Sequence, residues 1–249
     1  MNKFNNPIFF LFYLFSRPSL LLLLFKKIYL PVYIQYEWIK KYNINTFIDI
    51  GANQGKVSKV VYDFFPHVTI YAFEPMKAEF QNLKKYISPS LNIVLNNIAL
   101  SDSIGKTVFY INNDTPSSSM LKVSKYGKNL FPFLHKYHKV TVNKTTLDEY
   151  FKKRKLEGLV FMKIDVQGAE HLVLKGAKKL LKKIDLIHIE ISFKSIYENQ
   201  CLFDEIYNTL INEGFQYSGS AKDSDFYPYF ILPIYENSIF INKRCKEIL

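Results

Sequence analysis

The sequence predicts an α/β protein with a doubly wound, mostly parallel sheet of about seven strands, the last one antiparallel, and helices on both faces. Short apolar stretches alternate along the chain with segments whose apolar residues recur at helical spacing. This alternation is typical of a parallel sheet that is covered on both faces. Acidic residues also fall at the ends of three apolar stretches, namely Asp49, Glu74 and Asp165. Ligands bind at the carboxyl ends of the strands in such sheets, so these ends are the expected site.

The length of 249 residues allows one large domain with a short appendage. We expect an apolar and basic helical segment at residues 1–41 and the α/β domain at residues 42–249. Residues 7–25 are mainly apolar and nearly long enough to span a membrane. Arg17 opposes insertion by about 2.5–3.5 kcal/mol, which nearly cancels the gain from the apolar side chains. Two alternatives stay open, a membrane-surface contact through residues 7–27 and a helical pair packed on the domain, and both are favoured over a span.

The net charge of +11 would suit nucleic acid, anionic lipid or acidic substrates. The lysines are scattered, however, and no basic stripe is interleaved with aromatic residues, so the sequence does not favour nucleic acid as a partner. The two cysteines have no spacing typical of a zinc site or a disulfide framework. This favours the cytoplasm, free or peripheral at the inner face of a membrane. The oligomeric state is not predicted.

The first half of the domain alternates regularly between strands and helices. We expect strands at residues 46–50, 68–73 and 91–95. The first intervening helix carries apolar residues between Val57 and Phe65, and the second carries Phe80, Leu83 and Ile87.

The second half begins with two strands, at residues 105–111 and 139–142, which flank a long loop at about residues 112–138. Loops of this length in a compact domain are usually functional or disordered, and we assign this one to the acceptor side of the site. Ser117, Ser118 and Ser119 are candidate pocket residues, and an ordinary turn is the equal alternative. Alternation resumes with a strand at 159–164, a helix ending near residue 181, a strand at 186–191 and a helix at 202–212. Residues 215–218 and 238–242 can form a final antiparallel pair. His188 alternates within an apolar strand, which favours a core histidine.

The loop after the first strand runs from Asp49 to Gly55 and contains two glycines. Gly51 and Gly55 let the chain turn sharply near a ligand, and the next helix presents unpaired N–H groups. Dinucleotide loops usually have a third glycine in the spacing GxGxxG, which is absent here. A smaller ligand with a carboxylate and an ammonium group fits better. Asp49 would hold the ammonium group, and the backbone N–H groups around Ala52 and Asn53 would face the carboxylate.

Glu74 follows the second strand, 25 residues after Asp49. A carboxylate at this place can accept hydrogen bonds from both hydroxyls of a ribose. Asn97, after the third strand, could contact the edge of an adenine. The alternative is structural: Asn53 as the cap of the following helix and Glu74 facing solvent.

Taken together, these segments resemble the FkbM-type methyltransferase family over about residues 47–219. The resemblance is carried by residues 47–55, 72–75, 97–101, 117–120, 146–148, 162–170, 174–177 and 189–190. The segment from Lys163 to Glu170 is the most specific, although Gln167 stands where glutamate is common. The resemblance implies a Rossmann-like methyltransferase sheet, S-adenosyl-L-methionine as cofactor, and O-methylation of a saccharide or other small-molecule acceptor.

Transfer of a methyl group to a hydroxyl requires a base or a metal ion beside the acceptor. Asp165, at a strand end, is the leading candidate for the base, and Glu170 and Glu190 could converge with it. Three such carboxylates could hold Mg²⁺ or Ca²⁺, although spacing alone does not establish a metal site. Glu170 has a structural alternative, because an acidic residue in the first turn of a helix is favoured by the helix dipole.

Two other functions fit the same fold class. The missing third glycine argues against a nicotinamide-linked oxidoreductase. A non-catalytic adaptor that binds a membrane or a partner protein is the main alternative. The retained acidic and glycine residues at the strand ends argue against it, because no expected cofactor contact has been lost.

Overall fold

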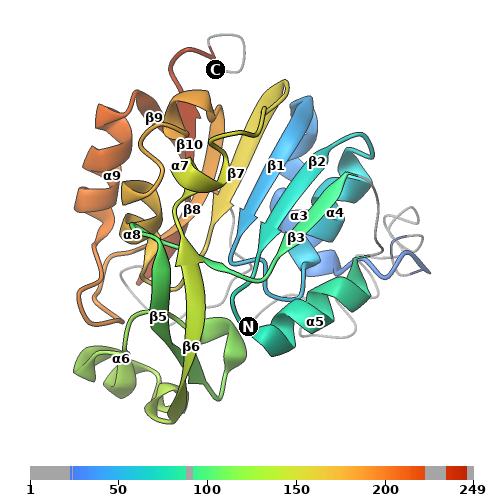
Figure 1. The fold of residues 1–249 in the computed structure, drawn as a ribbon. Helices are drawn as coiled ribbons and strands as arrows, with labels where there is room; N and C mark the ends of the chain where they lie inside the picture. The colour runs from blue at the N-terminus through green and yellow to red at the C-terminus, as the bar shows by residue number, and fades with distance from the viewer. Residues whose placement is uncertain (1–22, 24, 88–91, 222–233, 246–249) are drawn as a thin grey trace, which may run out of the picture.

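The computed structural model describes residues 23, 25–87, 92–221 and 234–245, and its centre is a seven-stranded sheet (Figure 1). The strand order is β3-β2-β1-β7-β8-β10-β9. The strands β3, β2, β1, β7 and β8 are parallel to one another, and β10 is antiparallel to both of its neighbours. The predicted fold class is therefore confirmed. The strands are β1 (Ile44–Ile50), β2 (Thr69–Phe73), β3 (Ile93–Asn96), β7 (Leu159–Ile164), β8 (Leu186–Ser192), β9 (Phe215–Ser220) and β10 (Tyr235–Asn242).

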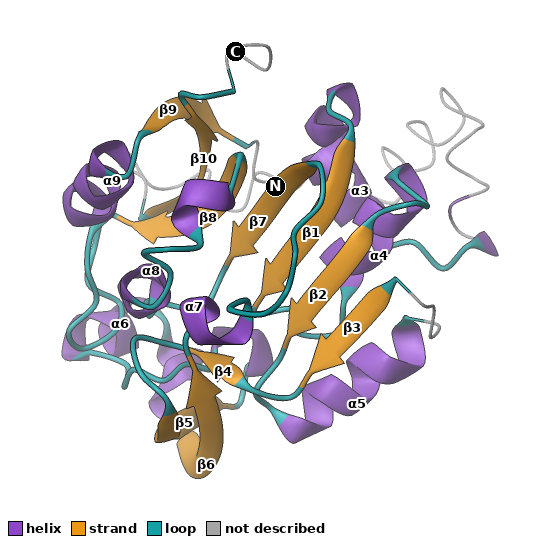
Figure 2. Ribbon diagram, turned by 45° about the horizontal axis from the view of Figure 1, so that its top comes forward, coloured by secondary structure: helices purple, strands orange, loops and turns teal. Residues whose placement is uncertain are grey.

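Helices cover both faces of this sheet (Figure 2). Neighbouring strand residues point to opposite faces, so Phe47 packs in one apolar cluster and Ile48 in the other. The Phe47 cluster takes in α3 (Leu30–Tyr36), η3 (Glu37–Lys41), α4 (Lys56–Phe64) and α5 (Lys77–Tyr86). The Ile48 cluster takes in α7 (Leu147–Tyr150), α8 (Glu170–Lys175) and α9 (Phe203–Asn212).

A second, three-stranded sheet of order β4-β6-β5 is inserted between β3 and β7. It consists of β4 (Ala99–Leu100), β5 (Gly105–Asn112) and β6 (Tyr137–Thr145), and β5 pairs with β6 in an antiparallel register from Gly105 opposite Lys144 to Asn112 opposite Tyr137. This pairing extends the strand expected at residues 139–142 at both ends. In Figure 1 the small sheet lies toward the ends at which the arrows of β1, β2 and β7 point.

The segment at residues 112–138 was expected to be a loop, and this expectation is partly wrong. It contains η4 (Thr115–Ser117), α6 (Lys125–Leu130) and η5 (Pro132–His135). The Ser124 side chain caps α6 by accepting the N–H of Gly127, and Pro132 occupies the first turn of η5. Both are ordinary helix-start signals, but the helices that follow are too short to show apolar periodicity.

The helix expected to end near residue 181 instead ends at Lys175. Beyond this point a residue distant in the sequence bonds the backbone: the Asp148 carboxylate accepts the N–H groups of Lys179 and Leu180 at 3.0 and 2.8 Å. These N–H groups are thereby withdrawn from a continuing helix, and a separate turn, η6 (Leu181–Lys183), follows.

Residues 1–22 and 24 lie outside the described chain, so most of the candidate membrane-contacting segment at 7–27 does as well. None of the helices in the described part of the chain is long and apolar enough to cross a membrane. Residues 30–41 pack on the sheet, where Tyr36 and Ile39 are buried with Phe47. The Tyr36 hydroxyl also bonds His188 Nδ1 at 2.9 Å.

Candidate active site

The carboxyl ends of β2, β1, β7 and β8 border a cavity of about 390 Å³. Its wall contains most of the residues that the sequence singled out, including the carboxylates at the ends of β2, β7 and β8. The predicted residues in the wall are Gly51, Ala52, Asn53, Glu74, Asp165 and Glu190. Apolar side chains complete it, including Met76, Ile98, Leu100 and Phe109.

The loop after β1 is held against the two neighbouring strands. The N–H groups of Gly51 and Ala52 both donate to the carbonyl of Phe73, at 3.1 and 3.0 Å. Gly51 has a φ of +76°, and a Cβ atom there would lie 1.9 Å from the carbonyl oxygen of Asp165. Only glycine fits so close an approach, which packs the loop directly against the end of β7.

Glu74 is buried at the end of β2, with its side chain in the cavity wall. Its two oxygens accept the N–H groups of Asn53, at 2.9 Å, and Met76, at 2.8 Å. Burial raises the pKa of Glu74 to about 7, against the opposing effect of these two hydrogen bonds. The solvent-facing alternative for Glu74 is therefore wrong. Glu74 borders the cavity, and its contact with a ribose stays a prediction.

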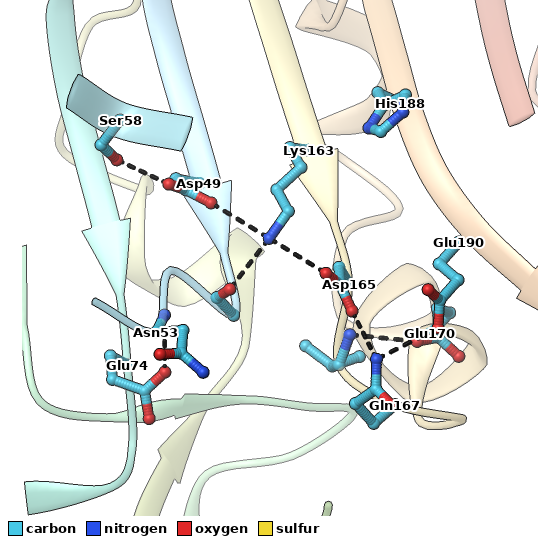
Figure 3. A network of polar contacts seen from close by, with 12 residues as sticks. Asp49, Asn53, Ser58, Glu74, Lys163, Asp165, Gln167, Glu170, His188 and Glu190 are labelled. Atoms are coloured by element: carbon cyan, nitrogen blue, oxygen red, sulfur yellow. Dashed lines mark hydrogen bonds and ion pairs between the residues drawn. The ribbon is translucent and has the colours of Figure 1, made fainter. Parts of the chain in front are cut away.

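Lys163 lies at the centre of a buried charge network that joins β1 to β7 (Figure 3). Its Nζ donates to the carbonyl of Gly51 at 2.9 Å and lies 3.5 Å from Asp49 and 3.4 Å from Asp165. Burial by itself would lower the pKa of Lys163, but the two carboxylates outweigh it and raise the pKa. The ammonium group therefore stays charged and fixes both Asp165 and the glycine loop.

Four predicted residues lie behind the cavity wall instead of in it. Asp49 is fully buried and bonds Ser58 Oγ at 2.6 Å as well as Lys163. Gly55 faces α5, where a Cβ atom would lie 2.4 Å from Leu83. Asn97 uses its amide to bond the carbonyls of Glu74 and Pro75, at 2.8 and 3.0 Å. The fourth residue, Glu170, has its own contacts.

Glu170 supports the turn between β7 and α8. Its Oε1 accepts the N–H groups of Val166 at 3.0 Å and Gly168 at 3.1 Å. Burial raises the pKa of Glu170 to about 7, although the backbone hydrogen bonds act in the opposite direction. This geometry matches the structural alternative for Glu170, since the carboxylate is occupied by the turn that carries Asp165.

Asp165 and Glu190 come from neighbouring strands and are bridged by Gln167 (Figure 3). The Gln167 amide nitrogen lies 2.8 Å from Asp165 Oδ1 and 3.1 Å from Glu190 Oε1. On the other side, the Tyr197 hydroxyl lies 3.2 Å from Gln167 Oε1. From the sequence, Gln167 was noted only as a departure from the family pattern, and no pattern pointed to Tyr197.

The three carboxylates expected to converge do not form a metal site. Across residues 23, 25–87, 92–221 and 234–245, no three His, Cys, Asp or Glu side chains are grouped so that they could hold a metal ion. The reason is the direction of Glu170 toward its own turn, while Asp165 and Glu190 share the amide of Gln167.

His188 is a core residue, as expected. Burial, with a smaller contribution from Lys163, lowers the pKa of His188 to about 3, so the ring is neutral at physiological pH. His188 lies on the same face of the sheet as Glu190, which is two residues further along β8, but its ring bonds Tyr36 and is absent from the cavity wall.

A second cavity, of about 780 Å³, adjoins the first. The two share Pro116, Gln167, Glu190 and Tyr235 in their walls. Of the three candidate serines, Ser117 lines the second cavity and Ser118 the first, and the fully buried Ser119 lines neither. Glu190 and Gln167 therefore lie where the two cavities meet, and Asp165 lines the first cavity beside Gln167.

Comparison with known proteins gives one family match and one curated relative. The family model of the methyltransferase FkbM domain matches residues 49–217, well over half of the chain. The 2-O-methyltransferase NoeI of Sinorhizobium fredii (strain NBRC 101917 / NGR234) is 26% identical over 159 residues. This match covers 61% of the chain and 65% of the relative, so the chain spans just under two thirds of that protein's length.

Solved structures resemble this fold at low identity. Methyltransferase FkbM from Methylobacillus flagellatus KT is 11% identical with a TM-score of 0.48, over 80% of this chain and 44% of that one. Fibrillarin from Aeropyrum pernix, solved with natively bound S-adenosyl-L-methionine, is 12% identical with a TM-score of 0.47, over 80% and 66% of the two chains.

Proposed function

Since this chain belongs to the FkbM family of S-adenosylmethionine-dependent methyltransferases, we propose that it transfers a methyl group to a hydroxyl oxygen of a sugar or another small metabolite. The observation that carries the proposal is the cavity across four adjacent strand ends. Glu74 lines one end of it, and Asp165 and Glu190 line the other, beside a second cavity that can admit an acceptor. The relative's name, a 2-O-methyltransferase, supports oxygen as the acceptor atom.

The residues present fit the cofactor. Gly51, Ala52 and Asn53 line the cavity, where their backbone would contact an amino-acid moiety, and Glu74 would accept the ribose hydroxyls. Met76, Ile98, Leu100 and Phe109 supply an apolar wall for a flat base. Three further residues would act indirectly. Asp49 would hold Lys163, Gly55 would allow close packing against α5, and Asn97 would hold the end of β2. S-adenosyl-L-methionine supplies a methyl group that is activated by the positive charge of its sulfur.

The protein then has to orient the acceptor and remove one proton. With the cofactor bound, the acceptor oxygen would attack the methyl carbon with a lone pair, and the electron pair of the broken carbon–sulfur bond would stay on sulfur. The hydroxyl proton would pass to a carboxylate, for which we propose Asp165 or Glu190, because Glu190 lines both cavities and Asp165 lines the first one beside it. Proton transfer to a positioned base typically contributes about 10²–10⁴-fold to the rate. Glu170 would position Asp165 by capping its turn, and no metal ion enters the proposal.

We also propose that the chain acts in the cytoplasm, free or peripheral at the inner face of a membrane. Both cysteines, Cys201 and Cys245, are free thiols in the structure, which suits a reducing compartment.

Calorimetric titration with S-adenosyl-L-methionine, S-adenosyl-L-homocysteine and NAD tests the cofactor. We expect binding of both S-adenosyl compounds and none of NAD. Failure of both to bind would contradict the methyltransferase function and favour the adaptor. Transfer of labelled methyl to a panel of methyl glycosides tests the chemistry. Asp165→Asn and Glu190→Gln should slow the transfer, whereas Glu149→Gln, an exposed glutamate outside both cavities, should not.

A further inference from the structure

A third cavity, of about 610 Å³, lies between residues 27–29, the start of α4 and the helix α5. Its described lining contains three lysines, Lys27, Lys56 and Lys85, and no aspartate or glutamate, and we call it the lysine cavity. Among the described residues, none of the three forms an ion pair. Lys56 instead lies over the ring of Tyr29, with its Nζ 4.5 Å from the ring centroid. An anion in this cavity would therefore meet three positive charges that no ion pair neutralises.

The chain that leads into the lysine cavity cannot neutralise it either. Residues 1–36 contain no aspartate or glutamate, but they do contain two lysines and an arginine before Lys27. Asp63, on the neighbouring helix α4, is already paired with Lys26 at 2.6 Å. The positive charge is therefore concentrated at this place, and it is more than a share of the net charge of the whole chain.

Two exposed aromatic side chains accompany the lysine cavity. Phe25 is 85% exposed and Tyr29 is 46% exposed. They belong to a turn in which the N–H of Ile28 donates to the carbonyl of Leu23 at 2.9 Å, and both of these residues are buried in the Phe47 cluster. Because its neighbours are anchored in the core, the turn holds its aromatic and basic side chains at the surface. Such a combination is typical of surfaces that lie among the headgroups of a membrane.

The sequence directly before this turn is apolar as well. Residues 8–15 and 20–25 are two continuous apolar stretches, and the second ends at Phe25. An anionic membrane offers phosphate groups to lysines and acyl chains to apolar side chains, whereas a soluble phosphate would use the lysines alone. The neighbourhood of the lysine cavity therefore favours a lipid as the source of the anion.

We propose that the lysine cavity binds the phosphate of an anionic phospholipid and that Phe25 and Tyr29 enter the same leaflet beside it. Gln54 and Lys56 line both the lysine cavity and the cofactor cavity, so a lipid bound here would place the cofactor site at the membrane surface. The inference deepens the proposed peripheral location by naming the lipid class and the residues that recognise it. It rests on the charge of this cavity and is independent of the proposed methyl transfer.

Flotation of the full chain with lipid vesicles tests the inference. Vesicles of phosphatidylcholine alone are compared with vesicles of phosphatidylcholine and phosphatidylglycerol in equal parts. We expect binding to the anionic vesicles, at least about tenfold weaker binding to the neutral ones, and weaker binding as salt is raised. The double variant Lys27→Gln/Lys85→Gln should bind the anionic vesicles about tenfold less, since each lysine near an anionic surface contributes separately. These two lysines are chosen because, unlike Lys56, they do not line the cofactor cavity.

The matched control is Lys152→Gln/Lys153→Gln. It removes the same charge from the densest basic run of the chain, directly after α7 and thus after a helix on the other face of the main sheet. This variant should bind vesicles as the wild type does. Phe25→Ser, which keeps all the lysines, should also weaken binding to the anionic vesicles, by about fivefold or more.

The inference is overturned if neutral vesicles bind equally well, or if Lys27→Gln/Lys85→Gln or Phe25→Ser floats as the wild type does. Glycerol 1-phosphate, titrated by calorimetry, identifies the soluble alternative: its binding together with an unaffected Phe25→Ser would assign the cavity to a soluble phosphate. Calorimetry with S-adenosyl-L-homocysteine on the same samples separates the two proposals. Cofactor binding without vesicle binding rejects only the lipid site, whereas vesicle binding without cofactor binding rejects only the methyl transfer.

Discussion

The side-chain amide of Gln167 donates to the carboxylate of Glu190 at 3.1 Å across the gap between two neighbouring strands. The same nitrogen bonds Asp165 at 2.8 Å, so one neutral donor holds two carboxylates close together. Gln167 has a φ of +56°, a backbone conformation that side-chain-bearing residues rarely adopt. Non-glycine residues with such backbones cluster at functional sites, where the surrounding structure holds them in place. A glutamate at this position would supply no donor and would add a third negative charge.

The first prediction concerns this bridge. Gln167→Glu should lower methyl transfer at neutral pH and move the acid limb of the pH–rate profile to higher pH. The physical reason is that mutually repelling carboxylates hold protons more tightly, so the base becomes available only at higher pH. Gln81→Glu, on the exposed face of α5, is the matched control. An unchanged pH–rate profile in Gln167→Glu would mean that the bridge does not control the base.

The second prediction concerns the pH dependence of cofactor binding. Because the pKa of Glu74 is raised to about 7, its ionised fraction falls steeply between pH 8 and pH 6. The ionised form is the better acceptor for two ribose hydroxyls, so affinity for S-adenosyl-L-homocysteine should fall about five- to tenfold over this range. Titration calorimetry at pH 6, 7 and 8 measures this affinity. Glu74→Gln should bind more weakly, and its affinity should not depend on pH. If the affinity of the variant fell equally with pH, another group would be responsible.

The third prediction separates a structural from a catalytic Glu170. Its pKa of about 7 in the folded protein lies above the ordinary value of 4.5. The folded state therefore binds the proton more tightly, and stability is lost as pH rises from about 4.5 to 7, by at most about 3 kcal/mol. Glu170→Gln keeps the oxygen that accepts both backbone N–H groups and removes the titration. The variant should therefore lose less stability than the wild type between pH 5 and pH 8.

Urea unfolding at the two pH values measures this difference, and methyl transfer by the same Glu170→Gln variant should remain within a few-fold of the wild type. A large loss of activity in a variant that is stably folded would instead support the catalytic role suggested by the sequence. Glu170→Ala leaves the N–H groups of Val166 and Gly168 without their acceptor. The free energy of unfolding should therefore fall by about 1–3 kcal/mol per unpaired group.

The fourth prediction concerns the buried charge network. Lys163→Met removes the cation between Asp49 and Asp165 and should destabilise the protein by about 3–5 kcal/mol, because Asp49 stays buried without its counter-charge. Lys106→Met, at an exposed position of β5, should change stability little. Adding Asp49→Asn to Lys163→Met should recover part of the loss. Urea denaturation of the single and double variants checks the coupling, and strictly additive effects would contradict it.

Much of the sheet could be predicted because the chain itself encodes it locally. The strand at Leu159–Ile164 was predicted at its observed bounds, and β1, β2 and β8 within two residues. Continuous apolar stretches, helical spacing and the glycine turn all reflect contacts within a few residues. For the same reason, the charged groups at the strand ends were predicted: parallel strands bring their carboxyl ends to one edge. Lys163 carried a usable signal too, since it lies two residues before Asp165 and therefore on the same face of β7.

Tertiary structure decided which of these groups face a ligand. Asp49 and Asp165 both lie at strand ends, yet Lys163 and Ser58 enclose Asp49, whereas Asp165 borders the cavity. The direction of Glu170 depends on the turn that it caps, and the end of α8 depends on Asp148 from another element. The sequence thus determined the fold, the family and the edge of the sheet that carries the site, because these follow from short-range patterning. The cavity walls, the Gln167 bridge and the second cavity required the three-dimensional structure, because they are formed by residues far apart in the sequence, as Asn113 and Tyr235 are.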